Sequence, residues 1–354
     1  MRIRNTLLPK DGRGRKWNGR RRYEITLAVS AVVLIMIFVS ALSVGRYRID
    51  FLTVIKVVFS RILPIERNWD RMTEAVIFTL RLPRSLSAVL IGSAMALSGA
   101  CYQSIFRNPM VSPDLLGVTS GSCVGAAVAI LLDGTGFAVE LSAFLTGVLT
   151  VFITTTIARL LHNEKTTILV LSGVIVSSFM SSLMSILKYV ADTDTKLAEI
   201  TYWTMGSFAS ITMSDILMAL PFLVLPSVVI LSMSFRLNVL SLGDGEAQSL
   251  GVDLGRTRGT FIICSTLLTA ASVCLAGTIG WVGLVIPHVS RLITGADNKR
   301  MLPLSMLLGS CFMLVIDILS RTITAAELKL GILTGIIGAP FFFFILFRQN
   351  RKVS

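Results

Sequence analysis

The chain has 354 residues, of which 53% are hydrophobic and 15% are charged, and its formal net charge is +13. A soluble fold of this length cannot bury so much apolar surface, so the composition excludes an ordinary soluble protein and indicates a polytopic membrane protein with one integral-membrane domain. The excess of cations does not indicate nucleic-acid binding. Nine of them lie among residues 1–22, directly before the first apolar run, as the positive-inside rule expects of a cytoplasmic tail.

The first apolar run extends over 21 residues, from Ile25 to Gly45. A signal peptide also begins with a basic segment, but this run is longer than a typical signal-peptide core and has no clean small-x-small cleavage site. We therefore expect a retained first helix. The expected organisation is a basic cytoplasmic tail (1–22), a single integral-membrane domain (23–348) and a cytoplasmic C-terminal tail (349–354).

Charge-free runs predict ten membrane-spanning helices. Nine runs can be read directly, and the run at 259–290 is long enough for two helices, with cations flanking both its ends and Gly277, Gly280 and Gly283 to break it. Both chain ends are basic, so both are expected in the cytoplasm, which requires an even number of spans. The sequence predicts an all-α fold with spans at 25–45, 85–106, 115–132, 141–158, 166–187, 216–235, about 259–279, 282–298, 301–316 and 330–347.

The segment 46–84 is expected outside the membrane on the outer side. Its apolar residues between Phe51 and Leu63 recur near helical spacing, which predicts a short amphipathic helix on that surface.

The loop at 236–258 is expected on the inner side. It is short, polar and punctuated by glycine, which predicts two short helices separated by a turn near Gly251, with Asp244 as the N-cap of a helix that starts at Gly245. Such a loop can be a docking element for a soluble subunit or an ordinary connector, and the spacing alone favours neither.

Charged residues near the outer ends of spans have two interpretations. Arg81, Arg84, Asp317 and Arg321 can pair within the chain and extend toward the interface, or they can form a cationic rim for acidic residues of a partner. The residues alone favour pairing. Asp317 and Glu327 lie near membrane depth, where ionisable groups are expensive, and they can line a path or form a structural pair.

The sequence contains no HExxH, no GxSxG and no GxxxxGK[ST] motif, so we expect neither catalytic residues nor ATP binding by this chain. Its five cysteines all lie in apolar runs without CxxC spacing, so neither disulfides nor a metal site is expected. No cofactor is predicted.

Nine short motifs occur in a family-specific order along residues 23–348. They are Arg81-Leu82-Pro83-Arg84; Gly92, Ser98, Gly99 and Gln103; Arg107-Asn108-Pro109 with Pro113, Leu116 and Gly117; Trp203-Thr204-Met205-Gly206-Ser207; Leu242-Gly243-Asp244 with Ala247, Leu250 and Gly251; Ala276 to Leu284 with Pro287, His288 and Arg291; Gly295 to Arg300; Asp317 with Arg321; and Glu327-Leu328 with Gly331 and Gly338-Ala339-Pro340-Phe341.

These motifs resemble those of permease subunits of binding-protein-dependent ABC importers for iron-siderophores, haem and cobalamin, the FecCD-type, ten-helix type II importers. The resemblance implies a bacterial cytoplasmic-membrane protein that pairs with a second, identical or paralogous, permease subunit. It also implies two cytoplasmic ATPase subunits, an extracytoplasmic substrate-binding protein and a small metal chelate as cargo. Lys329 departs from the family pattern, which usually has proline there.

The resemblance also assigns roles to residues. It implies that the segment 240–255 couples to the ATPase, that three arginines dock the binding protein, and that the fifth and tenth helices, about 166–188 and 328–347, line the path. The implied sets are Arg81, Arg84 and Arg321 for docking; Leu242, Gly243, Asp244, Glu246, Ala247 and Gly251 for coupling; Ser172, Gly173, Ser177, Gly331 and Gly335 for the path; and Gly92, Gly99, Gln103, Asn108, Pro109, Asp317 and Glu327 for structure or gating.

The expected function is inward transport of a ferric siderophore, driven by ATP hydrolysis on partner subunits. Cobalamin and haem are alternative cargoes within the same family. A secondary transporter driven by an ion gradient is the alternative from another class, but we find no internal repeat and the candidate charges lie near span ends. A purely structural membrane subunit is the third alternative.

Overall fold

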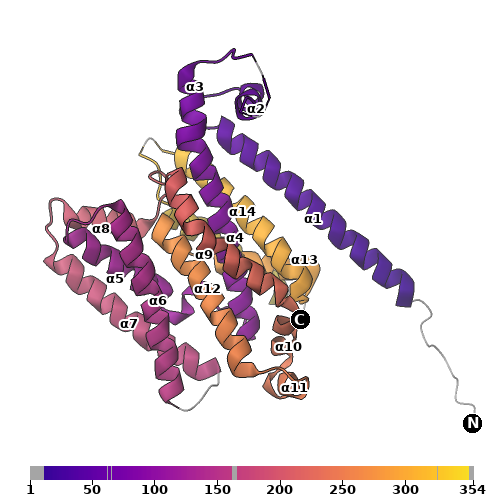
Figure 1. Ribbon diagram of the computed structural model, residues 1–354. Coiled ribbons are helices and arrows are strands. Elements are labelled where there is room, and N and C mark those ends of the chain that lie inside the picture. Colours follow the sequence, from indigo (N-terminus) through magenta and orange to yellow (C-terminus); the bar gives the residue numbers. More distant parts are fainter. Residues whose placement is uncertain (1–11, 62, 65, 162–165, 325, 351–354) are drawn as a thin grey trace, which may run out of the picture.

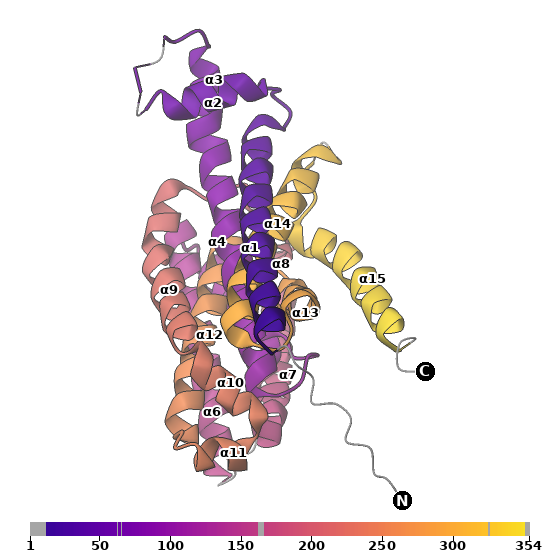
Figure 2. The same cartoon turned by 90° about the vertical axis from the view of Figure 1, so that its right-hand side faces the viewer.

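The computed structural model describes residues 12–61, 63–64, 66–161, 166–324 and 326–350. Within these ranges every regular element is helical (Figure 1). The helices form an elongated bundle, with α10 (Ser234–Leu242) and α11 (Asp244–Ser249) at one end and α2 (Phe51–Phe59) at the other (Figures 1 and 2). We call these the α11 end and the α2 end.

The predicted tails are only partly covered, because residues 1–11 and 351–354 lie outside the described residues. From Gly12 onward the basic segment is helical and continuous with the first span, forming α1 (Gly12–Ser43). The apolar part of α1 is only 17% buried, so α1 stands at the edge of the bundle with most of its surface free for lipid (Figure 1).

Ten helices occupy the ten predicted spans, which confirms the all-α prediction. Seven are long and apolar enough to cross a membrane, and three are shorter. The long helices are α1, α4 with its N-terminal extension (Arg71–Ile105), α6 (Gly136–Leu160), α7 (Thr166–Val190), α9 (Met213–Ser232), α12 (Leu254–Ala276) and α14 (Asn298–Thr322). The three with shorter apolar stretches are α5 (Val118–Leu131), α13 (Val282–Thr294) and α15 (Leu330–Asn350), whose apolar stretch is Leu330–Ile345.

The second span begins earlier than predicted. A continuous helix runs through α3 (Arg71–Ala75), a π-helical turn η1 (Val76–Arg81) and α4 (Leu82–Ile105). The prediction placed its start at residue 85 because two arginines end the charge-free run. Both arginines are buried inside the bundle: Arg81 donates to the Leu42 carbonyl and Arg84 to the Asp317 carboxylate. They therefore do not end the helix.

The amphipathic helix predicted after the first span is α2. Val54 and Val57 are buried in a small cluster with Leu42 of α1, whereas Phe51 and Leu52 are exposed. Asp50 caps its N-terminus by accepting the backbone N–H of Leu52 at 3.1 Å. The helix therefore lies across the end of α1 (Figure 2).

The predicted division of the run 259–290 is confirmed. α12 ends at Gly277 (φ +70°) and α13 begins after Trp281 (φ +70°). The unwound link hydrogen-bonds to the segment that follows α8 (Lys196–Met205): Ser207 N–H donates to the Ala276 carbonyl at 2.9 Å. Non-helical backbone at membrane depth is tolerated because protein groups satisfy it in this way.

The chain returns into the bundle after α4. The short 3₁₀ helix η2 (Pro113–Leu116) packs between α13 and α7: a Cβ on Gly283 would lie 2.3 Å from Pro113 Cγ, and one on Gly173 would lie 2.2 Å from the Leu115 carbonyl oxygen. α5 therefore starts inside the bundle at Val118, rather than at its surface, and its 14 residues suffice to reach the other end.

The core is built around α4, of which 19 of 24 residues are buried. Its glycines meet other backbones: a Cβ on Gly92 would lie 2.4 Å from the Gly309 carbonyl oxygen, and one on Gly99 would lie 1.8 Å from that of Gly283. Small residues allow such close helix crossings in a membrane protein, where little hydrophobic force acts between helices.

Candidate functional site

The segment between α9 and α12 forms two short helices, as predicted, but they are arranged differently. They are α10 and α11, and the break between them is at Gly243 (φ +141°), not at Gly251. The turn at Gly251 (φ +77°) instead precedes the membrane helix α12. Positive φ at both positions explains why glycine occupies them.

Asp244 does not cap α11 as predicted. It is the first residue of the helix, and its carboxylate makes no capping hydrogen bond. Instead it pairs with Arg258 Nη2 of α12 at 2.5 Å and with Arg107 Nη2 of the loop after α4 at 3.5 Å. Two positive side chains from distant segments attract the carboxylate more strongly than the free N–H groups of its own helix.

Two exposed leucines flank α11: Leu242 is the last residue of α10, and Leu250 directly follows α11. Leu242 and Leu250 are each 63% exposed, whereas Ala247 between them is fully buried. Glu246 is also exposed. The polar loop between α9 and α12 thus exposes apolar side chains on both sides of α11.

A second polar cluster lies at the start of α4 and the end of α14, toward the α2 end. Asp317 is fully buried and contacts two guanidinium groups: Arg84 Nε at 2.5 Å and Arg321 Nη2 at 3.0 Å. The first contact is a hydrogen bond, and the second is an ion pair without hydrogen-bond alignment. Arg84 also pairs with Glu327 at 2.9 Å, so the cluster links α4, α14 and the segment before α15.

Arg81 and Arg321 contact the C-terminal end of α1. Arg81 donates to the carbonyls of Leu42 at 2.7 Å, Ser43 at 2.8 Å and Tyr47, and Arg321 donates to that of Ala41 at 3.0 Å. The last carbonyls of a helix lack intrahelical partners and form the negative end of its dipole, so cations are stabilising there.

The exposed cationic rim expected from Arg81, Arg84 and Arg321 is therefore not what the structure shows. The three side chains are 5%, 7% and 7% exposed. Their contacts are with carbonyls at the end of α1, with the buried carboxylate of Asp317 and with Glu327, which is the internal pairing that the residues alone favoured. A role in docking a binding protein stays a prediction.

Of the five expected path residues, some pack and some face open space. Ser172 and Gly173 are buried where η2 crosses α7, and Gly331 lies against the Met205 carbonyl oxygen, 2.8 Å from the position of a Cβ. Ser177 is half-buried, and Gly335 has open space around it.

The exposed face of α7 carries a row of hydroxyl groups beyond Ser177. Each of these serines donates to the carbonyl four residues earlier, at 2.8 to 3.1 Å, which leaves its oxygen able to accept. They are Ser178, Ser181, Ser182 and Ser185.

The remaining predicted residues shape the loop after α4. The Gln103 amide donates to the Leu284 carbonyl at 3.0 Å, and the Asn108 side chain accepts the backbone N–H of Met110 at 2.9 Å, with Pro109 between them in the turn. Arg107 has φ +51°, so the loop holds it in a left-handed conformation next to Asp244.

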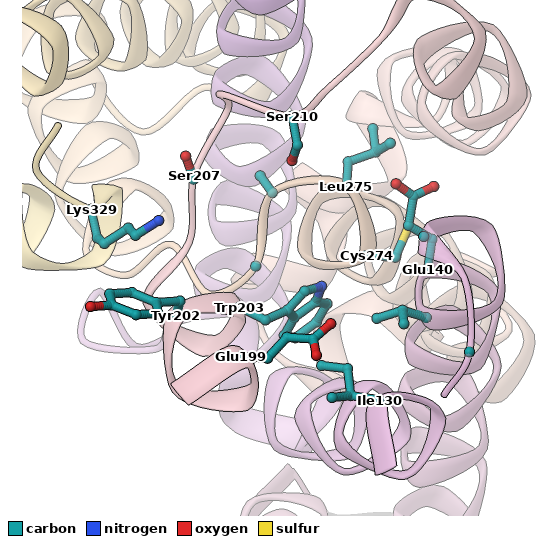
Figure 3. Close-up of a pocket in the computed structure, with 15 residues that line it drawn as sticks. Ile130, Glu140, Glu199, Tyr202, Trp203, Ser207, Ser210, Cys274, Leu275 and Lys329 are labelled. Atoms are coloured by element: carbon teal, nitrogen blue, oxygen red, sulfur yellow. The ribbon is translucent and has the colours of Figure 1, made fainter. Parts of the chain in front are cut away.

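A cavity of about 410 Å³ opens at the end of the bundle opposite α11, between the start of α6, the helix α8 and the link after α12 (Figure 3). Glu140 and Glu199 contribute carboxylates, and Lys329 lies with its Nζ 5.2 Å from the centroid of the Tyr202 ring. The lysine that departs from the family pattern is therefore part of this wall.

Three residues that the structure places around α11 were not among the predicted site residues: Arg107, Arg258 and Leu250. Arg107 and Leu250 are in quoted motifs, and Arg258 is one of the cations that flank the run at 259. The available signal for Arg107 and Arg258 was a positive charge directly at the end of a span. It does not reveal the partner of either residue, Asp244, because that partner lies in another segment of the chain.

The comparisons with known proteins agree with this geometry. The model of the FecCD transport family matches residues 33–348. The chain belongs to this family. The molybdate import system permease protein MolB of Haemophilus influenzae is 38% identical, over 90% of this chain and 94% of that protein. The hemin transport system permease protein HmuU of Yersinia pestis is 32% identical, over 95% and 99%.

A solved structure of similar sequence has the same fold. It is described as a metal-chelate type ABC transporter in an inward-facing conformation, with 38% identity, a TM-score of 0.81 and coverage of 91% of this chain and 98% of that one. Other relatives are named for iron-chelate and cobalamin import. As a member of the FecCD family, the chain is a multi-pass transport permease of the type II importer fold.

Proposed function

We propose that the chain is the permease subunit of an ATP-driven importer and that ATPase subunits dock on the α11 end. In this proposal the α11 end and both chain termini face the cytoplasm, and the α2 end faces the substrate-binding protein. A second permease subunit, identical or paralogous, completes the path.

The observation that carries the proposal is the construction of α11. Leu242 and Leu250 on either side of it are exposed and available to a partner. Asp244, the first residue of α11, pairs with Arg258 of α12 and with Arg107 of the loop after α4. A push on α11 is thereby passed to two membrane segments at once. Discrete repacking of such segments is how alternating access is achieved.

We propose a ferric siderophore as the cargo. The relatives named for iron chelates and haem support a metal chelate. In addition, the sequence of α7 has no charged residue before Lys188, and that of α15 has none before Arg348, so their exposed faces offer hydroxyls and apolar groups. Such a surface suits a large chelate that masks the charge of its metal ion. Cobalamin and haem are alternatives by the same argument.

Molybdate is a second candidate cargo, because the molybdate permease MolB is 38% identical over most of both chains. A small bare oxyanion is usually bound by cations or by converging N–H groups. The uncharged faces of α7 and α15 favour the chelate.

Uptake measurements test the cargo. A strain lacking the chain should lose accumulation of one labelled ferric siderophore, and the complementing chain should restore it. Labelled molybdate, cobalamin and haem are run in parallel. Loss of molybdate uptake alone would replace the proposed cargo, and normal uptake of all four would contradict this set.

A double variant tests the coupling. Leu242→Glu/Leu250→Glu should reach the membrane in normal amount but abolish uptake and release the ATPase during purification. The matched control is Leu161→Glu, which changes another exposed leucine at the end of α6. Normal uptake by the double variant that stops when ion gradients are dissipated would instead indicate a secondary transporter.

A further inference from the structure

A cavity of about 510 Å³ lies where α1 ends, at the α2 end of the bundle. Three arginines line it, Arg46, Arg48 and Arg321, together with Ser43, Val44, Gly45, Ile49 and Thr322. No carboxylate is among these lining residues. The lining of the cavity therefore carries positive charge.

Two of the three arginines that line this hollow, Arg46 and Arg48, have no carboxylate partner in the described ion pairs, whereas Arg321 is paired with Asp317. Arg46 and Arg48 are exposed and take part in none of the described ion pairs. Asp50, the carboxylate nearest in sequence, faces its own helix as the N-cap of α2. Asp317 behind the cavity is shared by Arg321 and Arg84.

The hollow lies at the depth of lipid headgroups. The helix from Arg22 to Ser43 rises about 32 Å at 1.5 Å per residue, close to the thickness of a hydrocarbon core of about 30 Å. If the arginines at positions 20–22 mark one membrane surface, the residues directly after Ser43 lie at the other. Phosphate groups of the lipids are found at this level.

The surroundings of the hollow are those of a lipid-facing surface. α1 is a peripheral helix, and Val44 and Tyr47 beside the cavity are exposed, as are Phe51 and Leu52 at the start of α2. An exposed tyrosine is typical of the membrane interface. Apolar side chains below and beside the arginines can contact acyl chains while the guanidinium groups contact a headgroup.

We propose that this cavity binds the phosphate of an anionic phospholipid headgroup through Arg46 and Arg48. Guanidinium groups bind phosphate oxygens through paired N–H donors, and the fixed positive charge of Arg321 at the base of the cavity favours an anion there. The other source of an acidic group at this face is a protein partner, but the apolar, lipid-facing position of α1 favours the lipid. The site requires only that the chain spans the membrane and is independent of the cargo.

Lipid retention on the purified transporter tests the proposal. The full-length protein is delipidated in detergent, phosphatidylglycerol or phosphatidylcholine is added in steps, and bound lipid is counted by native mass spectrometry. We expect one phosphatidylglycerol to bind in clear preference to phosphatidylcholine. Arg46→Gln/Arg48→Gln should weaken its binding by about 25-fold, because each basic residue near an anionic lipid surface accounts for about fivefold.

The matched control is Arg67→Gln/Arg71→Gln, which removes two exposed cations from the same segment but outside the cavity. It should leave phosphatidylglycerol binding unchanged. Arg46→Lys/Arg48→Lys keeps the charge but loses the paired guanidinium donors, so its phosphatidylglycerol binding should lie between that of the unmodified chain and that of the glutamine variant, which distinguishes a lost site from a misfolded chain.

Four outcomes would overturn the proposal. The first two are equal binding of both lipids by the unmodified protein and an equal loss of binding in the control variant. The third is displacement of phosphatidylglycerol by excess inorganic phosphate, which would assign a free-anion site. The fourth is unchanged lipid binding with a loss of binding-protein affinity in the Arg46→Gln/Arg48→Gln variant, which would assign a protein-docking surface.

Discussion

Asp317 is the residue on which the buried charge cluster depends. Its carboxylate is fully buried between Arg84 and Arg321. The other carboxylate of the cluster, Glu327, pairs with Arg84 only. A buried ion pair adds little compared with an apolar substitute, but removing one partner leaves uncompensated charge. The carboxylate therefore matters more for what its loss exposes than for the bond it makes.

The variant Asp317→Asn should be strongly destabilised, by about 3 to 5 kcal/mol, because both arginines then lack their shared anion. The thermal unfolding midpoint of the purified protein in detergent measures this. Asp194→Asn, which changes an exposed carboxylate, is the control and should have the midpoint of the unmodified chain. An equal midpoint for the two variants would contradict the assigned role.

Arg81 separates the two interpretations of the arginine cluster. Because it holds the final carbonyls of α1, Arg81→Gln should lower the thermal midpoint of the isolated permease, whereas Arg61→Gln, on an exposed side chain, should not. Loss of binding-protein affinity with an unchanged midpoint would instead support the docking role that the family resemblance implies.

At the scale of the helix, contact between backbones is the main device of the fold. α4 crosses α13 at Gly99, with less than a van der Waals separation available for a Cβ. By contrast, Gly259 of α12 has open space around it. The same residue type is therefore required in one helix and dispensable in another.

Gly99→Ala should destabilise the protein by about 1 to 3 kcal/mol or prevent its accumulation, because α4 and α13 must move apart. Gly259→Ala should be neutral or stabilising by up to about 1 kcal/mol, because alanine reduces the freedom of the unfolded chain. Membrane levels and thermal midpoints of the pair decide this, and similar behaviour of both variants would contradict the close crossing.

The number and order of the spans could be predicted from the sequence, because long charge-free runs mark membrane helices almost independently of their neighbours. Where charge is buried, that signal fails. Arg81 and Arg84 were read as a helix end, although the helix continues through them from Arg71. The start of α5 inside the bundle also depends on packing against α13 and α7, which no local pattern reports.

The candidate site shows the same division. The glycines at 243 and 251 predicted a loop with turns, and both have positive φ. The role of Asp244 could not be predicted, because one of its partners is 137 residues away in the chain. Local propensity favours a capping role for an aspartate at a helix start, and only the folded molecule brings Arg107 and Arg258 to it.

For the whole molecule, the proposed orientation makes a direct prediction. Two single-cysteine substitutions test it, Ser249→Cys and Thr193→Cys. Ser249 lies on α11 and Thr193 lies in an exposed turn after α7, at opposite ends of the bundle. A membrane-impermeant maleimide added to intact cells should label the second variant only, and permeabilisation should expose the first. The natural cysteines are buried or half-buried, so they should contribute little. The reverse pattern would invert the assigned topology.

The pairing of Arg84 with Asp317 also constrains biogenesis. The two residues are 233 positions apart, so at about 5 to 20 residues per second α4 leaves the ribosome roughly 10 to 50 s before α14 can supply the carboxylate. Arg81 already has its carbonyl partners at the end of α1, but Arg84 lacks its carboxylates until then, and a charged side chain without a partner is costly in hydrocarbon. We therefore expect the first turn of α4 to stay at the membrane surface until α14 is made. Its packing into the bundle is then a late step, after insertion, that depends on completion of the chain.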